Sequence, residues 1–239
     1  MGKQIEAMLP FAREAAKLQR DGMRWVANVM RNHGIKLVVD FESGFPSTNH
    51  LHHFLKDPHA RIVYSDKDKR VVRISRDKWL TGTDRNQVLY LECDAGEPEV
   101  LLDKLVSDGI VSRGERVGFV LWGFSAFLTD AALIHAAQKL YEWPNDDSIL
   151  VFQAQVANAD LANPKMRRIV DDYRLKLRTE IFVRPLDGYR NLLHPRREDD
   201  DGHFRPVLQL LKGSIRTQSV PMQEFYQGAG VGLGGVLVK

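Results

Sequence analysis

The chain has only one cysteine, Cys93, among its 239 residues. A single thiol excludes a disulfide framework and leaves a cysteine-based zinc site without enough ligands. No apolar run approaches the ~18 residues that a membrane-spanning helix needs. The amphipathic segment 1–17 carries acids, so it does not resemble a secretory signal. We therefore expect a cytoplasmic globular protein that has no membrane partner.

Charge of either sign is nearly balanced, at a net +3, but its distribution is uneven. Residues 61–85 hold eight Lys and Arg against four acids, and residues 165–197 hold ten against four. Residues 92–115 are acidic, with seven acids against two bases. Clustered cations in a nearly neutral chain indicate a surface that binds polyanions. The alternative is an ordinary solvated surface with local ion pairs.

Hydrophobic periodicity predicts alternating strands and helices. A helical pattern covers residues 3–33, where Pro10 and Gly22 are expected to break it. The strands are expected at 35–42, 87–93, 116–122 and 148–156, with a hairpin at 60–75 and helices at 49–56, 97–108, 125–143 and 163–178. This alternation is typical of an α/β fold, with a mixed central sheet and flanking helices.

Three regions follow from this pattern. Residues 1–34 are expected to form an N-terminal helical appendage, which could join copies of the chain into a homo-oligomer. Residues 35–212 form the α/β domain. Residues 213–239 form a C-terminal Gly-rich tail, since five glycines fall within 228–235.

Two carboxylates one residue apart end an apolar, β-branched run. Asp40 and Glu42 follow Leu37–Val39 and precede Gly44. The two-residue period of a strand places both side chains on one face, at the carboxyl end where α/β sheets bind ligands. Neighbouring carboxylates repel each other unless a cation lies between them, so the pair favours Mg²⁺ or Mn²⁺. Such ions would activate water for cleavage of a phosphodiester.

The segment Val38–Gly44 resembles the first motif of DEDDh exonucleases, a family with a ribonuclease-H-like fold, in which an apolar strand ends in Asp-x-Glu. The last motif of that family, His-x-x-x-x-Asp, is matched by His194 and Asp199. The resemblance implies that His194 is the general base for the attacking water. It also implies that Asp199 binds metal together with Asp40 and Glu42.

Two acids could supply the third carboxylate of such a metal site. The middle motif of the exonucleases has an Asp where this chain has Leu128, so Asp130 or Asp94 would supply the missing metal ligand. The same strand also resembles the first motif of PIN-like and NYN ribonucleases. Those enzymes would combine Asp40 with Asp94 and Glu92, and would not need a histidine.

The predicted helix 163–178 is rich in bases. Those that we expect to contact nucleic acid are Arg167, Arg168, Arg174, Lys176 and Arg178. Lys and Arg neutralise phosphates and release counterions, which makes such a helix suitable for RNA or DNA. The alternative is a solvated helix face whose bases pair with Asp171 and Asp172.

The sequence thus predicts a metal-dependent nuclease that acts on RNA or DNA. The alternative is a non-enzymatic nucleic-acid-binding or assembly protein that uses the Arg-rich helix. The Asp-x-Glu strand end favours the enzyme, and the missing acid of the middle motif favours the alternative.

Overall fold

The computed structural model describes residues 12–79, 87–156, 164–182, 184–199, 204–206 and 231–239. The strands are β1 (Leu37–Phe41), β2 (Arg61–Asp66), β3 (Val88–Glu92), β4 (Val117–Leu121), β5 (Ile149–Val156), β6 (Arg197–Glu198), β7 (Arg205–Pro206) and β8 (Val231–Val238). The α-helices are α2 (Ala12–Asn32), α3 (Leu51–Leu55), α4 (Lys69–Ile74), α5 (Pro98–Ser107), α6 (Asp130–Glu142), α7 (Pro164–Leu177) and α8 (Leu186–Leu192). A π-helical turn, η1 (Ser75–Trp79), follows α4, and a 3-10 turn, η2 (Ser125–Phe127), precedes α6.

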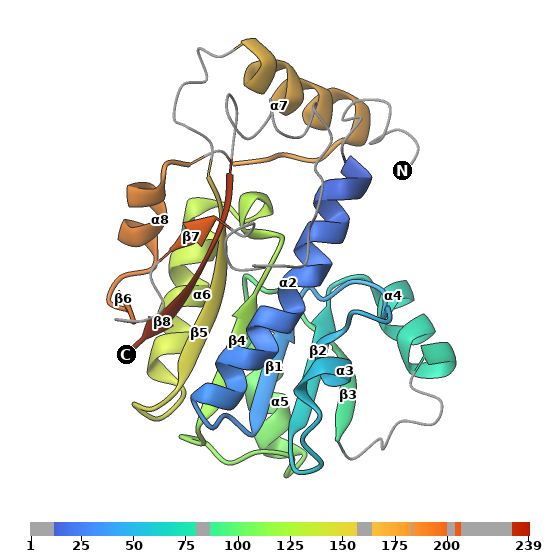
Figure 1. Ribbon diagram of the computed structural model, residues 1–239, viewed down its shortest axis with the longest axis vertical. Coiled ribbons are helices and arrows are strands. Elements are labelled where there is room, and N and C mark those ends of the chain that lie inside the picture. The colour runs from blue at the N-terminus through green and yellow to red at the C-terminus, as the bar shows by residue number, and fades with distance from the viewer. Residues whose placement is uncertain (1–11, 80–86, 157–163, 183, 200–203, 207–230) are drawn as a thin grey trace.

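The strands form one mixed sheet in the order β3-β2-β1-β4-β5-β8-β6, and β7 also pairs with β8. Strands β1 to β5 are parallel, whereas β8 is antiparallel to β5 (Figure 1). The predicted mixed sheet with flanking helices is therefore confirmed. The chain moves outward from β1 to β3 and then returns to β4 on the other side of β1, so the strand order reverses between β1 and β4.

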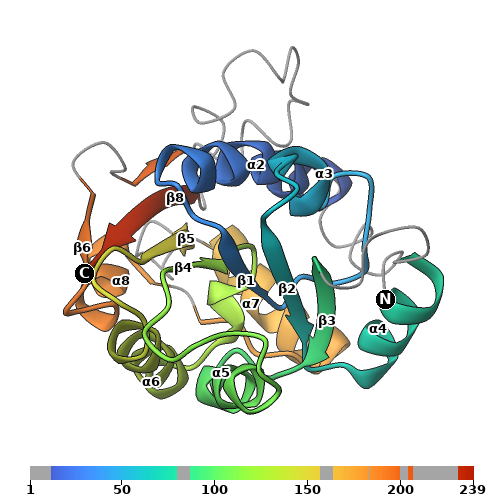
Figure 2. The same ribbon diagram turned by 90° about the horizontal axis from the view of Figure 1, so that it is seen from below.

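Helices cover both faces of the sheet (Figure 2). Helices α2 and α3 lie on one face, and α5 and α6 lie on the other. Strand β1 is buried along its whole length because both of its faces are covered. Val38 belongs to the core under α2 and α3, whereas Leu37 and Val39 belong to the core under α5 and α6.

Helix α2 packs against the sheet through a continuous apolar face. Leu18, Val26 and Met30 are buried in the first core. The Trp122 Nε1 atom, just beyond β4, donates a hydrogen bond to the Gln19 carbonyl at 2.9 Å. Gly22 does not break the helix in the structure. Its lack of a side chain makes room for the Trp122 ring, because a Cβ at this position would lie 2.6 Å from that ring.

We expect Gly22→Ala to destabilise the protein by about 1–3 kcal/mol, the usual cost of overpacking a core. Helix propensity alone predicts the opposite sign, since Ala is favoured over Gly by about 1 kcal/mol within a helix. Urea unfolding measures the change. Lys17→Ala, at an exposed position of the same helix, is the control and should stay within about 0.5 kcal/mol of wild type. A stabilised Gly22→Ala variant would show that the Trp122 contact does not restrict this position.

The expectation of a hairpin at 60–75 is wrong. Residues 60–75 form a strand followed by helix α4, not a hairpin, and the Asp68 side chain caps that helix by accepting from the Arg70 N–H at 2.8 Å. Because β2 and β3 are parallel, the chain between them has to cross over instead of turning back. The Gly-rich tail contains β8, which pairs with β5 over eight residue positions.

Among the described residues, no helix is both long and apolar enough to cross a membrane.

Candidate active site

Acidic residues gather where the parallel strands end. Asp40 lies at the end of β1, Asp66 ends β2, and Asp94 follows β3. These three strands are neighbours in the sheet, so their carboxyl ends meet at one edge. In open α/β sheets, ligands bind outside this edge at the point where the strand order reverses. The strand order therefore predicts a ligand site at the carboxyl ends of β1 and β4.

The loop after β1 is held by side chains from the next two strands. The Gly44 N–H donates to Asp66 Oδ2 at 3.2 Å, and the Ser43 hydroxyl lies 2.6 Å from that of Tyr90. The Tyr90 hydroxyl also donates to the Gly44 carbonyl. Gly44 has a positive φ of 67°, and Glu42 has one of 51°. The loop is thus a tight turn in which a glutamate adopts a backbone conformation that favours glycine.

A pocket of about 230 Å³ opens between this loop and helix α2. It lies at the reversal point, because its lining includes both the end of β1 and the residues after β4. The charged and polar lining comprises Gln19, Arg20, Asp40, Glu42, Ser43, Ser47, Asn49 and His50. Its larger apolar side chains are those of Met23, Phe45, Leu51, Trp122 and Phe124. Its volume suits a small ligand, since pockets for drug-sized ligands span about 300–1,000 Å³.

Burial changes the titration of both carboxylates at the end of β1. The Asp40 side chain is buried, and burial alone raises its pKa to about 8. Burial also raises the pKa of Glu42, to about 7, and the nearby charge of Asp66 acts in the same direction. Nearby Lys67 opposes this rise, but the buried Glu42 Oε1 has no hydrogen-bond partner in the described part of the chain.

His50 adds a neutral imidazole to the pocket wall. Its Nδ1 accepts the Ser47 N–H at 3.2 Å, so the proton of the neutral ring is on Nε2. Burial lowers the His50 pKa to about 3, and the charges of two neighbouring histidines and Arg20 lower it further. His50 therefore acts as a hydrogen-bond donor at neutral pH, and Nε2 is buried with no partner within the described ranges.

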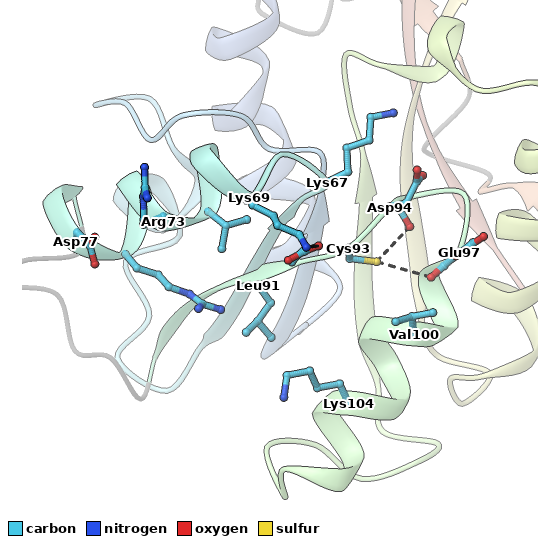
Figure 3. A pocket seen from close by; sticks show the side chains of 13 residues that line it. Lys67, Lys69, Arg73, Asp77, Leu91, Cys93, Asp94, Glu97, Val100 and Lys104 are labelled. Carbon is cyan, nitrogen blue, oxygen red and sulfur yellow. Dashed lines mark hydrogen bonds and ion pairs between the residues drawn. The ribbon is translucent and has the colours of Figure 1, made fainter.

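A second and larger pocket, of about 760 Å³, lies beside the edge strand β3 between α4 and α5 (Figure 3). Lys67, Lys69 and Arg73 line one side of it, and Lys104 lines the other. The Cys93 thiol at its inner wall donates to the Asp94 carbonyl at 3.1 Å. Burial raises the Cys93 pKa to about 12, so this thiol stays protonated and is a poor nucleophile.

The predicted metal site does not form. Asp40, Glu42 and Asp94 are at one edge of the sheet, but Asp94 Oδ1 accepts the Gly96 N–H at 2.8 Å. Asp130 pairs with Arg184, whose Nε donates to Asp130 Oδ1 at 2.8 Å. Across the described ranges, no group of three His, Cys, Asp or Glu side chains is placed to hold a metal ion. The prediction of Mg²⁺ or Mn²⁺ is wrong.

The proposed exonuclease pair lies at the opposite end of the sheet. His194 and Asp199 flank β6, which pairs with the last residues of β8, and these lie opposite Ile149 at the start of β5. Asp199 forms an ion pair of 3.4 Å with His33, which precedes the start of β1. The chain thus separates these two residues from Asp40 and Glu42 by the length of the sheet.

The basic helix α7 follows β5 and lies beyond the carboxyl edge of the sheet (Figure 1). Arg167, Arg168, Arg174 and Arg178 are exposed, and Arg174 pairs with Glu180 at 3.5 Å. The side chain of Lys176 lies outside the described set. Contact of this helix with nucleic acid stays a prediction, as does a homo-oligomer formed through the N-terminal segment.

Comparison with known proteins identifies the family. A family model described as S-adenosyl methyltransferase matches residues 1–194, which is most of the chain. The chain belongs to this S-adenosyl methyltransferase family. The resemblance to DEDDh exonucleases was therefore misleading, and neither the nuclease nor the non-enzymatic nucleic-acid-binding protein is the function that this family indicates. No curated protein sequence matches the chain.

Solved structures share the fold of this methyltransferase family member. A protein from Thermobifida fusca YX, described as a methyltransferase, is 17% identical with a TM-score of 0.78, and the match covers 98% of this chain and 85% of that one. A DUF574 family protein from Streptomyces avermitilis MA-4680 is 20% identical with a TM-score of 0.78, with coverage of 100% and 88%. Human N-acetylserotonin methyltransferase, solved with S-adenosylmethionine, is 14% identical with a TM-score of 0.54, with coverage of 100% and 56%.

Sequence reasoning missed several residues at this end of the sheet. Asp66 was assigned to a hairpin turn, although it ends an apolar run 22 residues after Gly44. An acid at about this distance from a glycine turn is a known signal of nucleotide-binding α/β sheets. Trp122 and Arg20 had no comparable signal, because only the packing of α2 on the sheet brings them beside Asp40.

Proposed function

We propose that the protein transfers a methyl group from S-adenosylmethionine to a small acceptor molecule. The observation that carries this proposal is the position of the 230 Å³ pocket at the carboxyl ends of β1 and β4, where the strand order reverses. Membership of the S-adenosyl methyltransferase family supports the same donor. Human N-acetylserotonin methyltransferase, which shares the fold, was solved with this molecule.

The residues present fit the ribose of the donor. Asp66 closes the loop after β1 by accepting the Gly44 N–H with Oδ2, and it accepts the Asp68 N–H at 2.8 Å with Oδ1. Each carboxylate oxygen has a second lone pair, so Asp66 can also accept a ribose hydroxyl. Nucleotide-binding sheets place an acid in this role about 20 residues after the glycine turn.

The residues also fit the charged end of the donor. Asp40 supplies a buried carboxylate at the pocket and Glu42 a half-buried one, and the buried Glu42 Oε1 lacks a hydrogen-bond partner within the described residues. Arg20, on the wall formed by α2, carries the opposite charge and would pair with the amino-acid carboxylate of the donor. When bound, S-adenosylmethionine supplies an electrophilic methyl group on a positively charged sulfur.

The rest of the site orients the acceptor and handles its proton. Trp122 and Phe124 give the pocket apolar walls, and residues of α2 form another wall. His50 Nε2 can donate a hydrogen bond to an acceptor oxygen or nitrogen. Asp40 has a pKa of about 8, so near neutral pH it can hold the proton that the acceptor loses as its new bond to carbon forms.

Isothermal titration calorimetry of the purified protein with S-adenosylmethionine and S-adenosylhomocysteine tests the proposal. We expect both to bind, since they share the adenosine and the amino-acid group. If neither ligand binds, the proposed function is wrong.

Asp66→Asn should weaken both ligands about 10–100-fold, the usual consequence of losing a hydrogen bond to a charged acceptor. The amide keeps the size of the side chain but replaces one acceptor oxygen with a donor. Glu92→Gln is the matched control, because Glu92 is exposed at the end of the neighbouring strand β3. Unchanged affinities in Asp66→Asn, measured by the same calorimetry, would exclude Asp66 from the ribose site.

A further inference from the structure

We propose that Asp40 and Glu42 make this site selective for charge, so that it holds the cationic methyl donor more tightly than the neutral thioether left after transfer. The inference rests on the proposed function and adds a property of this chain's own residues. S-adenosylmethionine and S-adenosylhomocysteine share every hydrogen-bonding group and differ in the methyl group and the charge on sulfur. The difference between their dissociation constants therefore reports the combined effect of the methyl group and the charge on sulfur, and its pH dependence reports the effect of the charge.

The first support is that Asp40 is a buried carboxylate for which no nearby cation offsets the effect of burial, and that one oxygen of the half-buried Glu42 is buried without a partner among the described residues. Asp40 is only 5% exposed, and burial is the sole cause of its shifted titration. Glu42 lies on the same loop with its Oε1 buried and unpaired within the described ranges. A buried acid without a partner is costly, and a cationic ligand placed beside it removes that cost.

The second support is the backbone of Glu42. Its φ of 51° is uncommon for a residue with a side chain, and such strain costs about 1–3 kcal/mol. The loop thus holds an acid in a conformation that glycine would adopt without strain. Strained residues of this kind concentrate at binding sites, where the bound state uses the side chain.

The third support comes from the groups that face the two acids. Tyr64 on β2 and Tyr90 on β3 lie near Asp40, and burial raises the pKa of both hydroxyls, so they remain neutral. His50 at the start of α3 is also neutral, which leaves Arg20 on α2 as the cation lining the same pocket.

Glu42 faces a similar excess of negative charge. Asp66 at the end of β2 and Asp94 after β3 both raise its pKa, whereas Lys67 and a hydrogen bond from the Ala95 N–H lower it. The Cys93 thiol, whose pKa this acid raises further, stays protonated. The facing groups thus favour a cationic ligand over a neutral one.

Proton linkage follows from this arrangement. In the free protein near neutral pH, Asp40 is largely protonated and Glu42 is about half protonated. A sulfonium beside them favours their ionised forms, so binding of the donor releases protons to the solvent. Once the methyl group has moved to the acceptor, the sulfur is neutral and the acids take up protons again. The product then loses an attraction that the donor had, which favours its release.

Calorimetry with the two ligands at pH 6 and pH 8 tests the inference. The carboxylate of Glu42, with a pKa of about 7, is mostly protonated at the lower pH and mostly ionised at the higher one. We expect the ratio of the two dissociation constants to shift about tenfold in favour of S-adenosylmethionine at pH 8. Titrations in phosphate and Tris, whose ionisation enthalpies differ, should show proton release for S-adenosylmethionine and less for S-adenosylhomocysteine.

Two variants assign the effect to these acids. Glu42→Gln and Asp40→Asn should each flatten the pH dependence of the ratio of the two dissociation constants. Glu97→Gln, an exposed acid outside the 230 Å³ pocket, should behave like wild type. Urea unfolding of each variant confirms that it is folded, and the wild-type pH series tests the inference even if a variant is not.

Two results would overturn the inference. One is equal binding of both ligands to the wild-type protein at both pH values, which leaves the proposed function intact. The other is a pH-dependent ratio that persists in both variants, which would place the charge selectivity in other residues. Absence of binding by either ligand is a different result, because it contradicts the proposed function itself.

Discussion

Asp40→Asn is expected to raise the free energy of unfolding at pH 8 by about 2–4 kcal/mol. Burial raises the pKa of this acid from 3.8 in the unfolded chain to about 8 in the folded protein. Its contribution to stability is therefore full below pH 4 and is lost as the pH rises through 8. The Asn side chain does not ionise, so the variant keeps its stability as the pH rises. Its buried amide needs hydrogen-bond partners, which limits the gain in the free energy of unfolding.

Denaturant unfolding at pH 5 and pH 8 measures this effect. The stability difference between Asp40→Asn and wild type should grow as the pH rises. Asp57→Asn is the control, because a hydrogen bond from Lys36 lowers the pKa of Asp57, so the stability difference between this variant and wild type should be the same at pH 5 and pH 8. A difference that is the same at both pH values would show that Asp40 does not titrate between them. A stability gain at this position together with weaker donor binding would identify it as a residue retained for function.

Arg184→Met is expected to destabilise the protein by about 2–4 kcal/mol, because two carbonyls lose a buried charged donor and each unsatisfied buried group costs about 1–3 kcal/mol. The Arg184 side chain is 6% exposed. Its guanidinium donates to the Ser125 carbonyl at 3.1 Å and the Leu128 carbonyl at 2.5 Å, as well as to Asp130. The variant leaves both carbonyls without this donor inside the protein.

Removal of the Arg184 hydrogen bonds should also disturb the 230 Å³ pocket, because Ser125 directly follows Phe124, which lines that pocket. We therefore expect weaker donor binding in Arg184→Met even at temperatures where the variant is folded. Arg190→Met is the control, since Arg190 is exposed and each of its ion pairs, with Asp187 at 2.9 Å and with Glu198 at 2.5 Å, should contribute less than about 1 kcal/mol. Similar urea midpoints for the two variants would mean that the Arg184 network has little effect on stability.

Most of the sheet could be predicted from local sequence. Strand β1 begins with the apolar run Leu37–Val39, which Asp40 follows, and β4 is apolar throughout, as expected of parallel strands covered on both faces. The hairpin predicted for 60–75 is wrong in its second half, because a short segment of six residues with several apolar side chains fits a strand and a helix equally well. Strand β8 was missed because its glycines weaken a strand locally, and pairing with β5 on one side and with β6 and β7 on the other stabilises it instead.

The sequence by itself determined that Asp40 and Glu42 end a buried strand, because period and hydrophobicity are local properties. It did not determine what those acids bind. A third acid close enough to share a metal, or a wall that suits an organic cation, depends on residues far apart in the chain. Only the tertiary structure placed α2 and Trp122 beside Asp40 and sent His194 and Asp199 to the opposite edge of the sheet. The physical reason is that strand order and helix packing, which decide these distances, come from burial of the whole core and not from any short motif.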